Sequence, residues 1–97
     1  MGRLEGKVAI VLGAAGHDNM GRVIARRFAT EGAKVVAAGR HEEDLRRFAQ
    51  TIGGTAAVCD ITSKADLDRL AAFTKQTFGR VDIGVNATGW GLLKPFL

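Results

Sequence analysis

The sequence predicts an α/β fold in which parallel β-strands alternate with α-helices. Four short apolar runs alternate with three segments of helical periodicity along the 97 residues, and no low-complexity stretch separates them. The first run, "KVAIVL", is apolar throughout after Lys7, which is typical of a strand buried on both faces. Such strands need right-handed crossover helices, so the pattern predicts half of a doubly wound parallel sheet with strand order 3-2-1-4.

Each predicted strand is a short run of apolar or small residues, bounded by polar residues or glycine. The runs cover residues 7–12, 33–39, 55–61 and 81–87. In a doubly wound sheet, ligands bind beyond the carboxyl ends of the strands, at the point where the strand order reverses. Here that point lies between the first and the fourth strand. The fourth strand would also be an unpaired edge, at which self-association is expected.

Three amphipathic helices are expected between the strands, and each is followed by a glycine. They cover residues 20–31, residues 41–51, and a third segment that begins at a cap on Thr62 or Ser63 and continues to Gly79. One side of each helix is apolar and should face the sheet. The apolar sides consist of Val23, Ile24, Ala25, Phe28 and Ala29 in the first helix, Leu45, Phe48 and Ile52 in the second, and Leu67, Leu70, Ala71, Ala72, Phe73 and Phe78 in the third.

Length and composition describe one small globular unit that can bury a core. No apolar stretch is long enough to cross a bilayer and the N-terminus does not resemble a signal peptide, so we expect a cytoplasmic protein without a membrane partner. The single cysteine, Cys59, lies in an apolar run and is expected to be a buried, reduced thiol. The net charge of +4 is modest, and acidic residues are interspersed among the basic ones, which argues against nucleic acid as a partner.

A glycine-containing loop joins the first strand to the first helix. The stretch "VLGAAGHDNMGRVIA" includes Gly13, Gly16 and Gly21. A helix that follows such a loop presents unpaired N–H groups and the positive end of its dipole, and glycines let a diphosphate approach the backbone closely. We therefore expect a site for nucleotide phosphates at this loop.

The whole chain resembles the N-terminal part of the short-chain dehydrogenase/reductase family. The motifs that carry the resemblance are "GAKVVAAGR", "VCDIT", "GRVDIGVNATG" and "KPF", which follow one another in the order and spacing of the family. The cofactor loop departs from the family's Thr-Gly-x-x-x-Gly-x-Gly: Leu12 replaces the Thr, Asn19 replaces the middle glycine, and the loop is two residues longer. Asn adopts positive φ more easily than other residues with a side chain, so Asn19 could keep the turn.

The resemblance implies a fold and a set of binding residues. Residues 1–97 would form part of a Rossmann-type NAD(P)-binding domain, without the catalytic C-terminal part. The implied cofactor-binding residues are Gly13, Asn19, Met20 and Gly21 at the phosphates, Asp60 and Ile61 at the adenine, and Asn86, Ala87 and Gly89 beneath the ribose. Two of these residues have a purely structural alternative: Asp60 as a cap of the third helix, and Asn86 as a tie between strands.

Arg40 is expected to determine the choice of cofactor. An enzyme selecting NAD needs an acidic side chain at the end of the second strand, but this position is Gly39. Arg40 follows, and its guanidinium can hold a 2′-phosphate in two places. NADP(H) is therefore favoured over NAD(H), with a solvated residue at the start of a helix as the alternative role for Arg40.

The resemblance further implies an oxidoreductase that transfers a hydride between NADP(H) and a small-molecule carbonyl or alcohol substrate, and that assembles as a homodimer or homotetramer. The family's catalytic Tyr-x-x-x-Lys is absent from this chain, which contains no tyrosine. We thus expect no catalytic residue and no metal site in these residues, which by themselves should be inactive. Three alternatives stay open: a divergent enoyl-thioester reductase, suggested by the loop length, a non-catalytic dinucleotide-binding module, and a methyltransferase, against which Gly39 argues.

Overall fold

The computed structural model describes residues 3–13, 20–60 and 62–86, and these form seven alternating strands and helices. The elements are β1 (Val8–Leu12), α1 (Met20–Thr30), β2 (Lys34–Gly39), α2 (Glu42–Ile52), β3 (Thr55–Val58), α3 (Lys64–Phe78) and β4 (Ile83–Asn86). The four strands form one parallel sheet in the order β3-β2-β1-β4. This confirms the predicted doubly wound α/β fold and its strand order 3-2-1-4.

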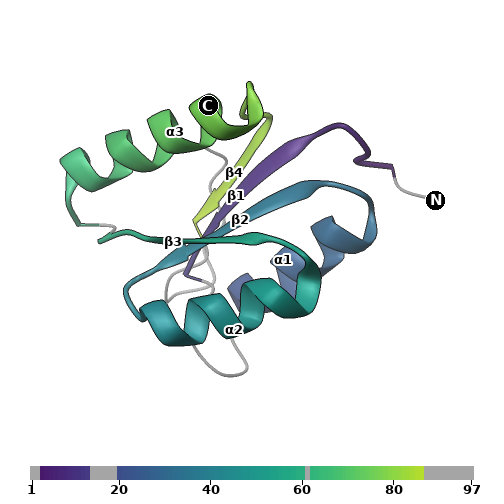
Figure 1. Cartoon of the computed structure of the whole chain (residues 1–97), viewed down its shortest axis with the longest axis horizontal. Helices are drawn as coiled ribbons and strands as arrows, with labels where there is room; N and C mark the ends of the chain where they lie inside the picture. Colours follow the sequence, from purple (N-terminus) through teal and green to yellow (C-terminus); the bar gives the residue numbers. More distant parts are fainter. Residues whose placement is uncertain (1–2, 14–19, 61, 87–97) are drawn as a thin grey trace.

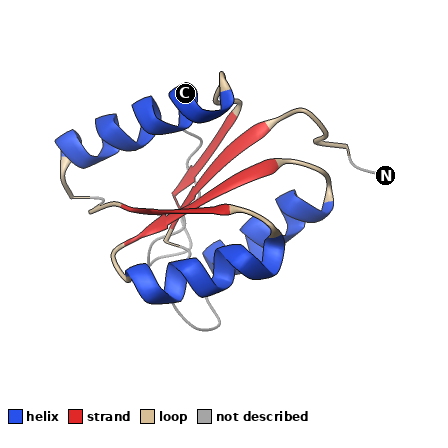
Figure 2. Ribbon diagram, viewed as in Figure 1, coloured by secondary structure: helices blue, strands red, loops and turns tan. Residues whose placement is uncertain are grey.

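The sheet lies between two helical layers, with α1 and α2 on one face and α3 on the other (Figure 1, Figure 2). Successive residues of a strand point to opposite faces, so β1 and β2 contribute to both halves of the core. Towards α1 and α2 the buried residues are Val11, Ala25, Val35, Ala37, Leu45 and Phe48, and towards α3 they are Ile10, Leu12, Val36, Ala38, Cys59 and Leu70. Burial on both faces explains why these strands read as continuous apolar runs.

The connection between α2 and β3 depends on glycine. Gly53 ends α2 in the left-handed conformation, with φ of 67°, and the N–H of Gly54 donates to the carbonyl oxygen of Ala49 at 2.8 Å. A Cβ on Gly54 would lie 2.8 Å from the carbonyl oxygen of Val35. The chain can therefore turn directly from the end of α2 into a strand that pairs with β2.

The strands begin one residue later than predicted at β1 and β2, and the bounds differ by more than one residue at two places. β3 ends at Val58 and not at residue 61, because the chain turns at Asp60, and β4 begins at Ile83 and not at residue 81. Within the described residues, β4 pairs with β1 alone and forms one edge of the sheet, as expected. None of the helices in the described part of the chain has the length and apolar character of a membrane span.

The predicted apolar faces are wrong at several positions. Val23 is 63% exposed and Phe73 is 41% exposed, and Ala71 and Ala72 are also exposed. The stripe of α3 that packs on the sheet instead includes Thr74, which is buried and whose hydroxyl donates to the carbonyl oxygen of Leu70 at 2.8 Å. Periodicity predicted an amphipathic helix, but the side chains beside the packed stripe remain in solvent.

Candidate functional site

The first residues after β1, β2 and β3 share the carboxyl edge of the sheet. The N–H of Gly13 donates to the carbonyl oxygen of Ala38 at 2.8 Å, and the N–H of Cys59 donates to the carbonyl oxygen of Gly39 at 2.8 Å. These two bonds continue the strand pairing for one residue beyond β1 and β3. The strand order reverses between β1 and β4, so this edge is the place where a doubly wound sheet binds its ligand.

The loop after β1 leads into a helix whose start suits an anion. Gly13 has a φ of 88°, a backbone conformation that side chains disfavour. Met20 is the first residue of α1, Gly21 is buried in the first turn, and this turn contains no acidic residue. Since α1 runs from the carboxyl edge to the start of β2, its first-turn N–H groups and the positive end of its dipole lie on the side of the predicted phosphate site.

Arg40 follows β2 directly, and its side chain is exposed. Within residues 3–13, 20–60 and 62–86, its guanidinium has no ion pair or hydrogen bond. The neighbouring arginines of α2 differ: Arg46 pairs with Glu42 at 2.8 Å, and Arg47 pairs with Glu43 at 3.3 Å. Glu42 and Glu43 at the start of α2 are thus paired with arginines of the same helix and not with Arg40.

The carboxylate of Asp60 is held by Thr62 through one oxygen. Oδ1 of Asp60 accepts from the N–H of Thr62 at 2.9 Å and from its hydroxyl at 2.7 Å. These two bonds, the hydroxyl foremost, lower the pKa of the Asp60 carboxyl, and the positive charge of Arg40 adds to the effect. The carboxyl is therefore ionised at neutral pH. Oδ2 has no donor among the described residues, so it remains available to a ligand.

Asp60 is not the N-cap of α3. That position is taken by Ser63, whose hydroxyl oxygen accepts from the N–H of Asp66 at 3.2 Å. Of the two predicted caps, Thr62 and Ser63, the structure therefore selects the second. The alternative role of Asp60 as a cap of the third helix is therefore wrong. Its side chain instead closes the turn before α3.

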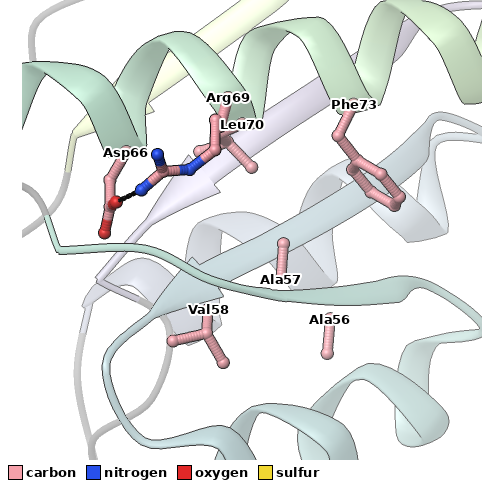
Figure 3. A pocket seen from close by; sticks show the side chains of 7 residues that line it. All are labelled: Ala56, Ala57, Val58, Asp66, Arg69, Leu70 and Phe73. Atoms are coloured by element: carbon pink, nitrogen blue, oxygen red, sulfur yellow. Dashed lines mark hydrogen bonds and ion pairs between the residues drawn. The ribbon is translucent and has the colours of Figure 1, made fainter.

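Asp66, in the first turn of α3, is a residue of this edge that was not predicted to belong to the site. Its Oδ2 accepts from the N–H of Asp60 at 2.9 Å, and its Oδ1 forms an ion pair with Arg69 (Figure 3). The Ser-x-x-Asp spacing from Ser63 to Asp66 marks a capping pattern. That spacing agrees with the predicted cap at Ser63, but it does not predict the contact of Asp66 with Asp60.

A groove of about 420 Å³ runs beside this turn, between the edge strand β3 and α3. Its walls are formed by Ala56, Ala57, Val58, Asp66, Arg69, Leu70 and Phe73 (Figure 3). Among the described residues, none of the predicted cofactor-binding residues lines it. Cys59 is buried and free, as predicted, and burial followed by the charges of Asp66 and Asp60 raises the pKa of its thiol.

The remaining predicted residues are described in part or not at all. Asn86 is the last residue of β4, where it lies in register with Leu12 of β1, but its side chain is outside the described part of the structure. The same holds for the side chain of Met20. Four predicted residues lie wholly outside the described ranges, namely Asn19, Ile61, Ala87 and Gly89.

Comparison with known proteins gives consistent matches. The family model described as enoyl-(acyl carrier protein) reductase matches residues 13–97. The 7alpha-hydroxysteroid dehydrogenase of Escherichia coli is 42% identical over 99 residues, which cover 97% of this chain and 38% of that protein. Among solved structures, a hydroxysteroid dehydrogenase from Escherichia coli matches with a TM-score of 0.81 and 39% identity, over 87% of this chain and 36% of that chain.

A second solved structure, actinorhodin polyketide ketoreductase with NADPH, matches with a TM-score of 0.78 and 32% identity, over 89% of this chain and 34% of that chain. The chain therefore spans less than two-fifths of the length of these relatives. The family model's match, residues 13–97, begins directly after β1 and includes β2, β3 and β4. Sequence motifs, strand order and these matches agree that the chain belongs to the short-chain dehydrogenase/reductase family.

Proposed function

We propose that this chain forms the cofactor-binding part of an oxidoreductase that transfers a hydride between NADP(H) and a carbonyl or alcohol group of a small molecule. The observation that carries the proposal is Arg40, an exposed guanidinium at the end of β2 without an ion pair among the described residues. The residue before it, Gly39, has no carboxylate that would repel a 2′-phosphate. The relative solved with NADPH is consistent with this choice.

The residues of the carboxyl edge fit the adenosine half of the cofactor. Gly13 and the start of α1 suit the diphosphate, and Arg40 suits the 2′-phosphate. Oδ2 of Asp60 can accept from the adenine amino group, because Thr62 uses only Oδ1. Residues 86–89 would lie beneath the ribose. When bound, the nicotinamide supplies or accepts the hydride; the chain contains no tyrosine, so we assign no proton transfer to its residues.

The choice between the two cofactors can be tested by titrating the chain with NADPH and with NADH. Replacing Arg40→Ala should weaken NADPH binding roughly 10- to 100-fold, the value of a charge-assisted hydrogen bond. NADH binding should change little, because NADH lacks the 2′-phosphate. Arg46→Ala is the matched control, since Arg46 is an exposed arginine of α2 that already pairs with Glu42.

Two results would contradict this choice of cofactor. Equal losses for NADPH and NADH in the Arg40→Ala variant would mean that Arg40 does not contact the 2′-phosphate. A similar loss of NADPH binding in the Arg46→Ala variant would mean that the general positive charge of the surface matters, and not the position of Arg40.

Enoyl-thioester reduction is the second candidate. It is favoured by the length of the loop between Gly13 and Gly21 and by the description of the matching family model. The test uses a protein that carries this chain and a catalytic part. Oxidation of NADPH in the presence of an enoyl-thioester such as crotonyl-coenzyme A would favour enoyl-thioester reduction over reduction of a carbonyl substrate. Homo-oligomeric assembly and a cytoplasmic location, and the non-catalytic and methyltransferase alternatives, stay predictions from the sequence.

A further inference from the structure

We propose that Asp66 is a positioning residue for adenine recognition, which acts through Asp60 without touching the cofactor. This inference rests on the proposed function, because it concerns the same nucleotide site. Its basis is the turn between β3 and α3, in which the backbone and side chain of Asp60 are each held by a different partner.

Asp60 is fixed at three separate points. Its N–H donates to Oδ2 of Asp66 at 2.9 Å, and its carbonyl oxygen accepts from the N–H of Ser63 at 3.0 Å. Its side chain accepts twice from Thr62 through Oδ1. These contacts define the position of the carboxylate and leave Oδ2 as the oxygen without a donor among the described residues.

Asp66 can hold the turn because its own position is fixed by α3. It lies in the first turn of the helix, where its N–H donates to the hydroxyl of Ser63 at 3.2 Å and its Oδ1 pairs with Arg69 (Figure 3). In a capping box, a carboxylate at this position reaches back to the N-cap residue itself. Here it reaches three residues further, to Asp60. The helix thus holds the residue that we expect to meet the adenine, and holds it before any ligand arrives.

A purely structural role for Asp66 makes a different prediction. If Asp66 only stabilised the start of α3, its loss would reduce the folded fraction of the chain. The binding of every nucleotide would then weaken by the same factor. If it positions Asp60, its loss should reduce the preference for a base with an amino group over a base with a carbonyl group at the same place. The ratio of two affinities therefore separates the two roles.

The experiment measures dissociation constants of the chain for NADPH and for the hypoxanthine analogue of NADPH, which carries a carbonyl in place of the adenine amino group. The wild-type chain should prefer NADPH about tenfold, as expected for a hydrogen bond to a charged acceptor. Asp66→Ala should reduce the preference to less than about threefold, since the carboxylate of Asp60 then loses its fixed position.

Three further variants make the result decisive. Asp66→Asn should retain the wild-type preference, because its amide oxygen can still accept from the N–H of Asp60. Asp68→Ala is the matched control: it removes the same charge from the same helix, where Asp68 pairs with Lys64 on the exposed face. If Asp66→Ala does not fold, Asp66→Ser replaces it, because a serine hydroxyl in the first turn is too short to reach Asp60.

The outcomes distinguish this inference from the proposed function. A wild-type chain that does not bind NADPH would contradict the proposed function, and this inference with it. A wild-type chain that binds NADPH without preferring it to the hypoxanthine analogue, or an Asp66→Ala variant that keeps the full preference, would overturn the role of Asp66 alone. A preference that falls in Asp68→Ala as much as in Asp66→Ala would also overturn it.

Discussion

Asp60 lies at the carboxyl edge of the sheet, where the strands end, and Asp82 lies at the amino edge, where the strands begin. Their carboxylates are held in different ways. At the amino edge, Oδ2 of Asp82 accepts from the N–H of Val8 at 2.8 Å, and Oδ1 accepts from Nε and Nη2 of Arg80 at 3.0 Å and 2.7 Å. At the carboxyl edge, Asp60 has donors among the described residues on Oδ1 only. Both oxygens of Asp82 therefore have donors, whereas among the described residues only one oxygen of Asp60 has them.

The pKa of both carboxyls is lowered, by different neighbours. For Asp82 the hydrogen bond from Arg80 is the main cause, followed by the bond from the N–H of Val8. For Asp60 the bonds from Thr62 come first. A lowered pKa therefore does not distinguish a structural carboxylate from a ligand-binding one. The two carboxylates differ in the second oxygen and in the nearby arginine: Arg80 is paired with Asp82, whereas Arg40 has no carboxylate in an ion pair among the described residues.

The largest effect on stability is expected at the amino edge. Asp82→Asn should lower the thermal midpoint of unfolding by several degrees, because an amide cannot accept from both Val8 and Arg80 and presents its own donors to them. The bond from the N–H of Val8 to Asp82 joins the start of β1 to the residue before β4, across most of the chain length. The N–H of Asp82 also donates to the carbonyl oxygen of Val8 at 2.9 Å. Thermal unfolding followed by circular dichroism measures the change.

The pH dependence sharpens this test. Since the folded-state pKa of Asp82 lies below its ordinary value of 3.8, its ionised carboxylate stabilises the folded state above that value. That stabilisation is lost as the pH falls through the lowered value, so the midpoints of wild type and Asp82→Asn should converge in strong acid. Asp68→Asn, on the exposed face of α3, is the control and should leave the midpoint unchanged at neutral pH.

A smaller effect on stability but a clear effect on binding is expected at the carboxyl edge. Asp60→Asn can keep the bonds from Thr62 through its amide oxygen, so the fold should be retained. Its amide N–H groups would then face the amino group of adenine, and NADPH binding should weaken about tenfold. Two results would contradict the proposed difference between the two edges. One is unchanged NADPH binding in Asp60→Asn, and the other is a loss of NADPH binding in Asp82→Asn after correction for the folded fraction.

The fold could be predicted from the sequence because its signals are local. A continuous apolar run such as residues 7–12 predicts a strand buried on both faces, and the glycines after each helix predict where it ends. The exposed Val23 and Phe73 were assigned wrongly, because helical spacing does not determine which of two adjacent stripes packs on the sheet. That choice depends on tertiary contacts.

The candidate site could be predicted only in part, for a similar reason. Arg40 and Asp60 were identified because they follow strands and match a family motif. The bond from Val8 to Asp82 joins residues 74 positions apart, and the bond from Asp60 to Asp66 depends on the conformation of a turn. No local pattern in the sequence predicts either contact.

An amide NMR titration of the chain with NADPH would show directly which edge of the sheet binds the cofactor. We expect the signals of Gly13, Arg40 and Asp60 to shift on binding and those of Val8 and Asp82 to stay in place, and we expect NADH to produce the same pattern only at higher concentration. Shifts confined to the amino edge, or a spectrum unchanged by NADPH, would contradict the claim that the carboxyl edge of this sheet binds NADP(H).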